Sequence, residues 1–314
     1  MRGAFVTEYG PAGTVTWGEL PDPASAPGHV VVKVLAAAVD HVDTFVRAGS
    51  WPTEVTWPLV VGRDLVGEVV EPSDSAYQKG QLVWTSSAGY GRRPGATAEL
   101  VAVQTGRCYP LPDVDPVQAV ATFHGAATAT LALRRVRLAV GEQVFVHGAG
   151  GGVGSVVVAA AMAAGAIVTA TARDDASVAW LRELSGRVSV IDTRVQEPHP
   201  RAVDVHWDAT GTIPLDAALR SCAGGGRVVV TARRETDAIA SSALYLADQS
   251  VVGFVMSGAT RADLGWAAEQ TNQLLAAGLR VRIGQVLPMS EAGHAHQLME
   301  AGRAHGKIVL VPPQ

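Results

Sequence analysis

The stretch of sequence that decides the fold is Val144-Phe145-Val146-His147-Gly148-Ala149-Gly150-Gly151-Gly152-Val153-Gly154. A run typical of a buried strand enters a glycine-rich turn, and an alanine- and valine-rich run typical of a helix leaves it. The glycines let the chain turn tightly, let a pyrophosphate approach the backbone and let the helix pack closely on the strand. The start of that helix also offers unpaired N–H groups and the positive end of its dipole to phosphates.

This context on both sides of the turn favours a dinucleotide-binding turn over a purely structural one. We assign to the cofactor the turn residues His147, Gly148, Gly150, Gly151, Gly152, Val153 and Gly154. His147, at the end of the strand, has a mainly structural role as the alternative.

Strands and helices alternate on both sides of this turn, which predicts βαβ units and a parallel sheet. Strands are expected at 143–146, 166–170, 188–191, 203–207 and 227–230, and helices at 118–136, 153–164, 177–184 and 215–221. Before about residue 115 the chain instead carries short valine runs bounded by proline and glycine, which predict a β-rich domain. Helices are expected again near 264–277 and 292–301, before a final strand at 307–311.

The end of the strand at 166–170 bears on the type of cofactor. NAD-selective folds usually carry an acidic residue there for the ribose 2′-hydroxyl, whereas this chain has Thr171, and Arg173 follows two residues later. A guanidinium can pair with a 2′-phosphate, so we expect NADPH. Asp174 and Asp175 leave two alternatives open, since either can neutralise Arg173 or cap the next helix.

Composition narrows the classes of function. The 314 residues are 48% hydrophobic and 17% charged with a net charge of −4, as in a well-buried globular protein with no signal for nucleic acid or an anionic membrane. The first residues show no signal-peptide apolar core, and the apolar stretch at 153–172 is glycine-punctuated, so we expect a cytoplasmic enzyme. The two cysteines, Cys108 and Cys222, cannot form a disulfide framework or a cysteine-rich zinc site.

Several further motifs resemble the zinc-free quinone oxidoreductases of the medium-chain dehydrogenase/reductase superfamily, the group that includes zeta-crystallin. The resemblance covers nearly the whole chain. The motifs are Ala38 to Gly49, Pro58 to Gly67, Gly95 to Val101, the turn from His147 to Gly154, and Gly306 to Leu310.

This resemblance implies a Rossmann domain, with a doubly wound parallel sheet, inserted into a β-rich GroES-like catalytic domain, with substrate between the two. We place the boundaries at 1–117 and 256–314 for the catalytic domain and at 118–255 for the Rossmann domain. The resemblance also implies a homodimer in which the strand near 250–255 extends the sheet. We further assign Thr210, Thr231 and Lys307 to the cofactor.

No metal is expected. Catalytic zinc needs three protein ligands, and Asp40 stands where zinc alcohol dehydrogenases carry their first cysteine ligand. Asp40, His41 and Asp64 are the one set that could still assemble a site. Without a metal, quinones and α,β-unsaturated carbonyls are better substrates than simple ketones, because hydrogen bonds suffice to stabilise the enolate-like oxygen after hydride transfer.

Three catalytic candidates stand where the chain departs from the family pattern, namely Asp40, His124 and Trp51. We expect burial to raise the pKa of Asp40 so that it can donate a proton, with a backbone-capping role as the alternative. His124 is either a proton donor or a satisfied core histidine, and Trp51 either walls the pocket or only packs. The segment Val230 to Arg233 also departs from the family pattern. Asp43 and Arg47, at i,i+4 spacing, predict a local ion pair, and Asp64 is expected to be structural.

These observations predict an NADPH-dependent, zinc-independent reductase of quinones or α,β-unsaturated carbonyls. The altered pocket residues leave open a pathway-specific enoyl reductase or tailoring enzyme of secondary metabolism. A protein that binds NADPH without turning it over is the alternative from another class.

Overall fold

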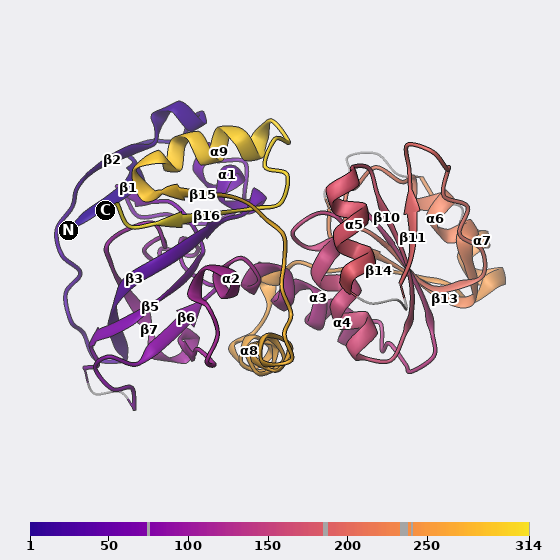
Figure 1. The fold of residues 1–314 in the computed structure, drawn as a ribbon, viewed down its shortest axis with the longest axis horizontal. Coiled ribbons are helices and arrows are strands. Elements are labelled where there is room, and N and C mark those ends of the chain that lie inside the picture. The colour runs from indigo at the N-terminus through magenta and orange to yellow at the C-terminus, as the bar shows by residue number, and fades with distance from the viewer. Residues whose placement is uncertain (74–75, 185–187, 233–237, 240, 314) are drawn as a thin grey trace. The chain divides into compact units, whose positions relative to one another are not determined.

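The computed structural model describes residues 1–73, 76–184, 188–232, 238–239 and 241–313 (Figure 1). Two compact units divide the chain. Unit 1 comprises Met1–His124 and Thr260–Gln314, and unit 2 comprises Gly125–Ala259. The sequence placed the corresponding boundaries at 117/118 and 255/256, close to the ends of these units. Arg233, one of the residues singled out in the sequence, lies outside the described part of the chain.

Unit 2 contains a six-stranded parallel sheet in the order β11-β10-β9-β12-β13-β14. The first three strands in chain order are β9 (Gln143–His147), β10 (Ile167–Ala172) and β11 (Val188–Asp192), followed by β12 (Val203–Asp208), β13 (Cys222–Val230) and β14 (Ser250–Gly253). Counted along the chain, the spatial order is 3-2-1-4-5-6, which is that of a doubly wound dinucleotide-binding fold. The predicted Rossmann fold is confirmed.

Helices cover the two faces of this sheet (Figure 1). Helices α4 (Gly154–Ala163) and α5 (Asp175–Leu184) pack on β9, β10 and β11, while α6 (Leu215–Ser221) and α7 (Ser241–Ala247) pack on β12 and β13. Helix α3 (Phe123–Arg135) precedes the sheet in the chain. The core strands carry valine and phenylalanine at buried positions, such as Val144, Phe145 and Val146, because both faces of a parallel sheet are covered.

Unit 1 is built from both ends of the chain. Its larger sheet has the order β15-β16-β3-β5-β6-β8, with β7 also paired to β3, and a smaller sheet has the order β2-β1-β4. The N-terminal part supplies β1 (Arg2–Val6), β2 (Thr16–Glu19), β3 (His29–Val39), β4 (Leu59–Val60), β5 (Asp64–Glu71), β6 (Leu82–Thr85), β7 (Leu100–Gln104) and β8 (Tyr109–Pro110). The C-terminal part supplies β15 (Ile283–Pro288) and β16 (Lys307–Val311).

The return of the chain positions the site in unit 1. Strand β16 pairs antiparallel with β3, with Ile308 opposite Val39. Lys307, the first residue of β16, therefore arrives beside the end of β3, where α1 (His41–Ala48) begins. Three more helices complete the unit, namely α2 (Pro116–Val120), α8 (Arg261–Ala276) and α9 (Ala292–Glu300), with the short 3-10 helices η1 (Ala12–Thr14), η2 (Thr105–Arg107) and η4 (Met289–Glu291).

None of the helices in the described residues is long and apolar enough to cross a membrane.

Candidate active site

The glycine turn in unit 2 connects β9 to α4, and its glycines are required by close contacts. Gly148 has φ +76°, which disfavours any side chain, and a Cβ there would lie 2.4 Å from Cγ2 of Thr210. A Cβ on Gly154 would lie 2.4 Å from the carbonyl oxygen of Gly148. The turn therefore closes only with glycine at both positions.

Gly151 is less constrained by the protein itself than Gly150, where a Cβ would lie 2.5 Å from Oγ of Ser177. The nearest atom to a Cβ on Gly151 would be the carbonyl oxygen of Gly148, at 3.4 Å, an ordinary contact distance. Glycine at this position instead leaves room for a ligand against the backbone. Helix α4 begins at Gly154, and the first N–H groups of a helix have no partner within it. This arrangement fits a pyrophosphate.

Thr171 and His147 hold the turn from the neighbouring strand. The backbone N–H of Gly148 donates to Oγ1 of Thr171 at 3.0 Å, and the same oxygen lies 3.0 Å from Nδ1 of His147. Thr171 is buried. The structure thus gives both residues a structural contact at the turn, and their contact with a cofactor stays a prediction.

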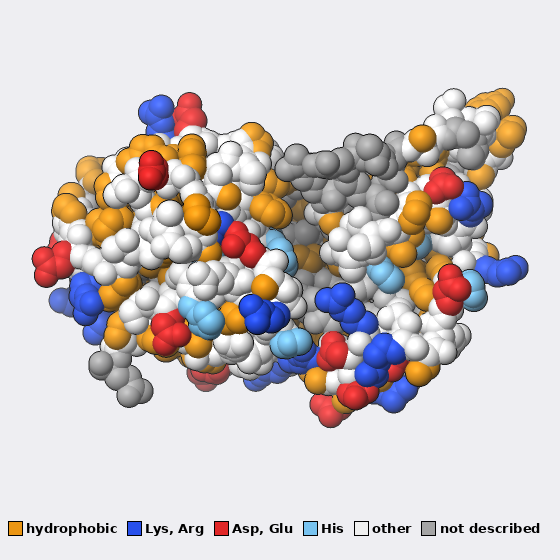
Figure 2. Space-filling model, turned by 90° about the horizontal axis from the view of Figure 1, so that it is seen from above, with side chains coloured by type: hydrophobic (Ala, Val, Ile, Leu, Met, Phe, Trp, Pro, Cys, Tyr) orange, Lys and Arg blue, Asp and Glu red, His pale blue; other side chains and the backbone are white. Residues whose placement is uncertain are grey.

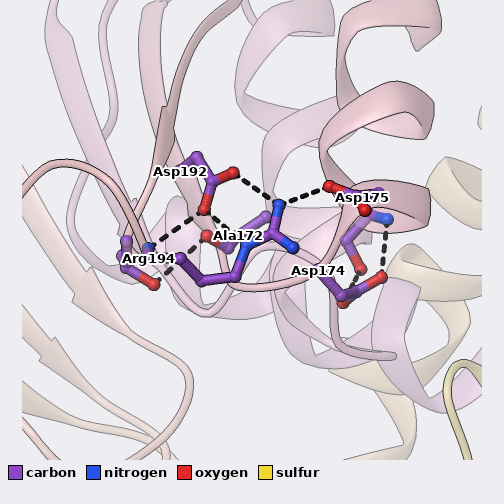
Figure 3. A network of polar contacts seen from close by, with 7 residues as sticks. Ala172, Asp174, Asp175, Asp192 and Arg194 are labelled. Atoms are coloured by element: carbon purple, nitrogen blue, oxygen red, sulfur yellow. Dashed lines mark hydrogen bonds and ion pairs between the residues drawn. The ribbon is translucent and has the colours of Figure 1, made fainter.

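Three charged residues at or beyond the ends of β10 and β11, namely Asp175, Asp192 and Arg194, form a network that does not include Arg173 (Figure 3). Arg194 pairs with Asp175 and with Asp192, whose Oδ2 lies 2.6 Å from Nη2. Asp174 accepts hydrogen bonds from the backbone N–H and the hydroxyl of Ser177, at 2.9 and 2.6 Å. Asp174 and Asp175, the two aspartates that follow Arg173, make these contacts with other residues. The exposed guanidinium of Arg173 therefore has no carboxylate partner among the described residues.

Thr210 and Thr231 lie at the carboxyl ends of β12 and β13. Oγ1 of Thr210 donates to Asp208 at 2.6 Å, which fixes the loop above the turn. Oγ1 of Thr231 accepts from Nε1 of Trp207 at 3.1 Å. Ligands of open α/β sheets bind at this carboxyl edge. Both residues remain cofactor predictions.

A buried ion pair forms the centre of the candidate site in unit 1. Lys307 donates to Oδ1 of Asp40, and the two side chains are 5% and 9% exposed. Burial of both charges makes their mutual contact essential, because either one alone would be left uncompensated. Lys307 thus lies in unit 1 with Asp40, whereas the glycine turn belongs to unit 2. The assignment of Lys307 to the cofactor stays a prediction.

The expected rise in the pKa of Asp40 is wrong. Burial does act to raise this pKa, but the charge of Lys307, the proximity of His124, the hydrogen bond from Lys307 and the charge of Arg63 together outweigh it and lower the pKa. The pKa of Lys307 is raised despite its burial, chiefly by the charge of Asp40. Near neutral pH the pair is an ammonium and a carboxylate, so Asp40 is not the proton donor that the sequence suggested.

Two more carboxyl groups and an imidazole surround this pair. Burial and the charge of Asp40 raise the pKa of Asp43 to about 7 and that of Asp64 well above its usual range. Asp64 accepts a hydrogen bond from the backbone N–H of His124 at 2.9 Å, which confirms a structural contact for it. Burial lowers the pKa of His124 to about 4, so its imidazole is neutral near pH 7.

Four buried polar atoms in this group have no hydrogen-bond partner within the described residues. They are Oδ2 of Asp40, Oδ1 of Asp43, Oδ1 of Asp64 and Nδ1 of His124. A buried polar atom without a partner costs free energy. A bound substrate or water would supply the missing partners.

The same group resembles a metal site in its donor types. Asp40, Asp64 and His124, and not the predicted His41, bring ligand atoms within 4.8 Å of one another. However, the ammonium of Lys307 already pairs with Asp40, and Arg63 adds a second cation that acts on the pKa values of Asp40 and His124. A divalent cation would meet both positive charges, so these residues do not fit zinc while Lys307 is protonated.

Two further predictions have specific outcomes. The ring of Trp51 packs against that of Phe45, with centroids 6.3 Å apart, and against the apolar cluster that contains Val42 and Val46. These contacts correspond to the alternative in which Trp51 only packs. The predicted ion pair of Asp43 with Arg47 is wrong. Asp43 accepts from the backbone N–H of Asp40 at 2.8 Å, and Arg47 pairs with Glu300 on α9.

Sequence reasoning missed the pairing of Lys307 with Asp40 and the role of Arg194. The first joins residues at opposite ends of the chain, and no local pattern signals it. The second had a signal, since Arg194 lies two residues after the end of β11, and the end of β11 pairs with that of β10.

Two family models match the chain. The alcohol dehydrogenase GroES-like domain matches residues 26–113, and the zinc-binding dehydrogenase domain matches residues 185–310. Quinone oxidoreductase of Homo sapiens is 27% identical, over 99% of this chain and 98% of its own length. Acryloyl-coenzyme A reductase of Metallosphaera sedula is 26% identical, over 93% of this chain and 95% of its own length.

Two solved structures are also similar to this chain in fold. An alcohol dehydrogenase superfamily protein from Novosphingobium aromaticivorans is 27% identical, with a TM-score of 0.88 over the full length of both chains. The quinone oxidoreductase of Thermus thermophilus, solved also in complex with NADPH, is 27% identical, with a TM-score of 0.81 over 99% of this chain and 100% of its own.

The fold and these matches show that the chain belongs to the medium-chain dehydrogenase/reductase superfamily. Within that superfamily it falls in the branch of quinone oxidoreductases related to zeta-crystallin. The predicted fold class and family are confirmed.

Proposed function

We propose that this chain is an NADPH-dependent oxidoreductase that transfers hydride to quinones or α,β-unsaturated carbonyl compounds. The observation that carries the proposal is the glycine turn of unit 2, which closes only with glycine at Gly148 and Gly154 and leaves space for a ligand at Gly151. The solved complex of a similar quinone oxidoreductase with NADPH supports the choice of cofactor.

Unit 2 holds the cofactor in this proposal. The turn and the start of α4 bind the pyrophosphate through backbone N–H groups. Arg173, whose neighbouring aspartates are occupied elsewhere, pairs with the 2′-phosphate. Arg194, already held by two carboxylates, positions the loop beside it. When bound, NADPH supplies the hydride.

Unit 1 stabilises the acceptor in this proposal. Hydride addition to the β-carbon of an enone leaves negative charge on its oxygen, and neutral His124 can donate a hydrogen bond from Nδ1 to that oxygen. The ammonium of Lys307 adds a positive charge in the same buried group. Asp40, ionised by Lys307, holds that ammonium in place. A proton from water then completes the α-carbon, or the second oxygen of a hydroquinone.

A second copy of this chain is the partner that we propose for unit 2. Strand β14 lies at the end of the six-stranded sheet and pairs with β13 on one side. Tyr245 and Leu246 on the adjacent α7 are 83% and 80% exposed. Figure 2 shows hydrophobic side chains projecting at the right-hand end of the molecule, the end at which Figure 1 places α7. Pairing of two β14 strands would satisfy this edge, and light scattering that finds only a monomer would refute it.

The function is tested by following the absorbance of NADPH, and separately of NADH, with panels of quinones and conjugated enones. We expect rapid consumption of NADPH with members of at least one panel. His124→Ala should lower kcat for the same acceptor, with His294→Ala, on the exposed side of α9, as the control. NADPH that binds tightly but is consumed with no acceptor would favour a non-catalytic binding protein, and consumption with a single pathway enone would favour the specialised enoyl reductase.

A further inference from the structure

Four arginines gather in unit 1, and the charge of one of them, Arg63, also acts on the group around Asp40 and Lys307. They are Arg63, Arg93, Arg107 and Arg261, which we call the arginine cluster. They come from four separate segments of the chain: the residue before β5, the loop after β6, η2 and the first residue of α8. The fold, and not a local sequence pattern, therefore brings these four guanidiniums together.

Shared neighbours hold the cluster together. Ser87 joins two of its members, because its carbonyl oxygen accepts from Nε of Arg93 at 2.6 Å and its hydroxyl accepts from Nη1 of Arg107 at 3.3 Å. The ring of Tyr90 joins Arg93 to Arg63, whose Cζ atoms lie 5.6 and 5.2 Å from the ring centroid. Such cation–π contacts stabilise the guanidiniums where they are but do not neutralise them.

The fourth member arrives with helix α8. Helix α8 packs on η2, and Nη1 of Arg261 lies 3.8 Å from the position of a Cβ on Gly106, the residue before Arg107. Burial, with repulsion from the other arginines of the cluster, lowers the pKa of Arg93 to about 10, and burial with repulsion from Arg261 and Arg63 also lowers that of Arg107. Mutual repulsion among the guanidiniums thus contributes to the lowered pKa of both Arg93 and Arg107.

Three of the four arginines lack a carboxylate partner. Within the described residues no carboxylate pairs with Arg93, Arg107 or Arg261, and Nε of Arg107 is buried without a hydrogen-bond partner. By contrast, buried Arg47 is paired with Glu300, and half-buried Arg227 is paired with Glu142. Uncompensated like charges destabilise a fold, which indicates that the arginine cluster is kept for an anionic ligand.

We propose that the arginine cluster binds the phosphate groups of the acceptor substrate, so that the acceptor is an α,β-unsaturated acyl thioester of a phosphate-bearing carrier such as coenzyme A. This inference rests on the proposed function. Guanidiniums recognise phosphate with paired N–H donors. A single carboxylate would balance one of the three unpaired guanidiniums, whereas a diphosphate with a further phosphate carries enough negative charge to balance all three.

The direct test is calorimetric binding of coenzyme A and, separately, of inorganic pyrophosphate to the full chain. Wild type should bind coenzyme A, and Arg107→Ala or Arg261→Ala should each weaken binding about tenfold, the loss of one charge-assisted contact of about 1.4 kcal/mol. Arg261 is exposed, so its replacement should leave the fold intact. Arg107→Lys keeps the charge and should weaken binding less than Arg107→Ala. Arg303→Ala, exposed on the same unit, is the control and should bind as wild type does.

Kinetics distinguish the possible sources of the phosphate. For Arg261→Ala we expect the ratio of kcat/KM for crotonyl-coenzyme A to that for an uncharged quinone to fall about tenfold. Pyrophosphate that binds as tightly as coenzyme A, or a loss of affinity for NADPH in place of coenzyme A, would overturn the assignment to the acceptor. So would an unchanged ratio.

Failure of this inference and failure of the proposed function give different results. Reduction of uncharged quinones by a protein that does not bind coenzyme A overturns the inference and leaves the function standing. Absence of hydride transfer to every acceptor overturns the function, while calorimetry still decides whether the arginine cluster binds coenzyme A.

Discussion

Removing one charge from the buried pair of Asp40 and Lys307 should destabilise unit 1 strongly. The two side chains are 9% and 5% exposed, so Lys307→Met leaves the carboxylate of Asp40 buried beside two other carboxyl groups, Asp43 and Asp64. Breaking a buried pair by removing one partner costs about 3–5 kcal/mol. The exposed Lys79→Met, which removes the same charge at the surface, should cost less than about 0.5 kcal/mol.

Guanidinium unfolding followed by intrinsic fluorescence measures this loss. The double variant Asp40→Asn with Lys307→Met removes both charges and should recover much of the stability, because no buried charge is left alone. A loss for Lys307→Met that equals that of Lys79→Met would refute the reasoning. A double variant that loses the sum of the two single losses would contradict a direct coupling of the pair.

Three other changes test separate parts of the account. Gly154→Ala places a Cβ 2.4 Å from a backbone oxygen of the turn and should abolish NADPH binding in a titration followed by fluorescence, whereas Gly265→Ala, with open space around it, should bind normally. Arg173→Ala should raise the KM for NADPH about tenfold and change that for NADH much less, and equal changes would show that Arg173 does not contact the 2′-phosphate. Burial lowers the pKa of His296 to about 3, so folding excludes a proton that the unfolded chain binds below about pH 6.5, and stability falls as the pH drops from there toward 3. His296→Leu should remove up to roughly 1.4 kcal/mol per pH unit of that fall, measured by unfolding at several pH values, and an unchanged pH profile would show that His296 is not the source.

The fold was predictable because its signals are local. The strand, turn and helix around Gly148 lie in one continuous stretch, and the alternation that follows has the period of βαβ units. The stretches predicted as strands at 188–191 and 203–207 are β11 and β12 in the structure. The helix predicted near 264–277 is α8, which begins at Arg261 because Thr260 caps it by accepting from the backbone N–H of Asp263.

The site was less predictable because its charges are set by distant residues. Asp40 and Lys307 lie 267 positions apart, and only the pairing of β16 with β3 brings them together. Without that contact, burial alone would raise the pKa of Asp40, which is what the sequence suggested. The spacing of Asp43 and Arg47 likewise suits an ion pair, but α9 brings Glu300 to Arg47, and Asp43 turns to the start of its own helix.

The central claim is that hydride passes from NADPH to an activated acceptor. The most direct test uses NADPH deuterated at the transferred position, with a conjugated enone as acceptor and mass spectrometry of the product. The account predicts a saturated carbonyl product that carries one deuterium at its β-carbon, formed by the wild type and lost in Gly154→Ala. NADPH that binds while the acceptor is recovered unreduced, or a product without deuterium, would contradict it.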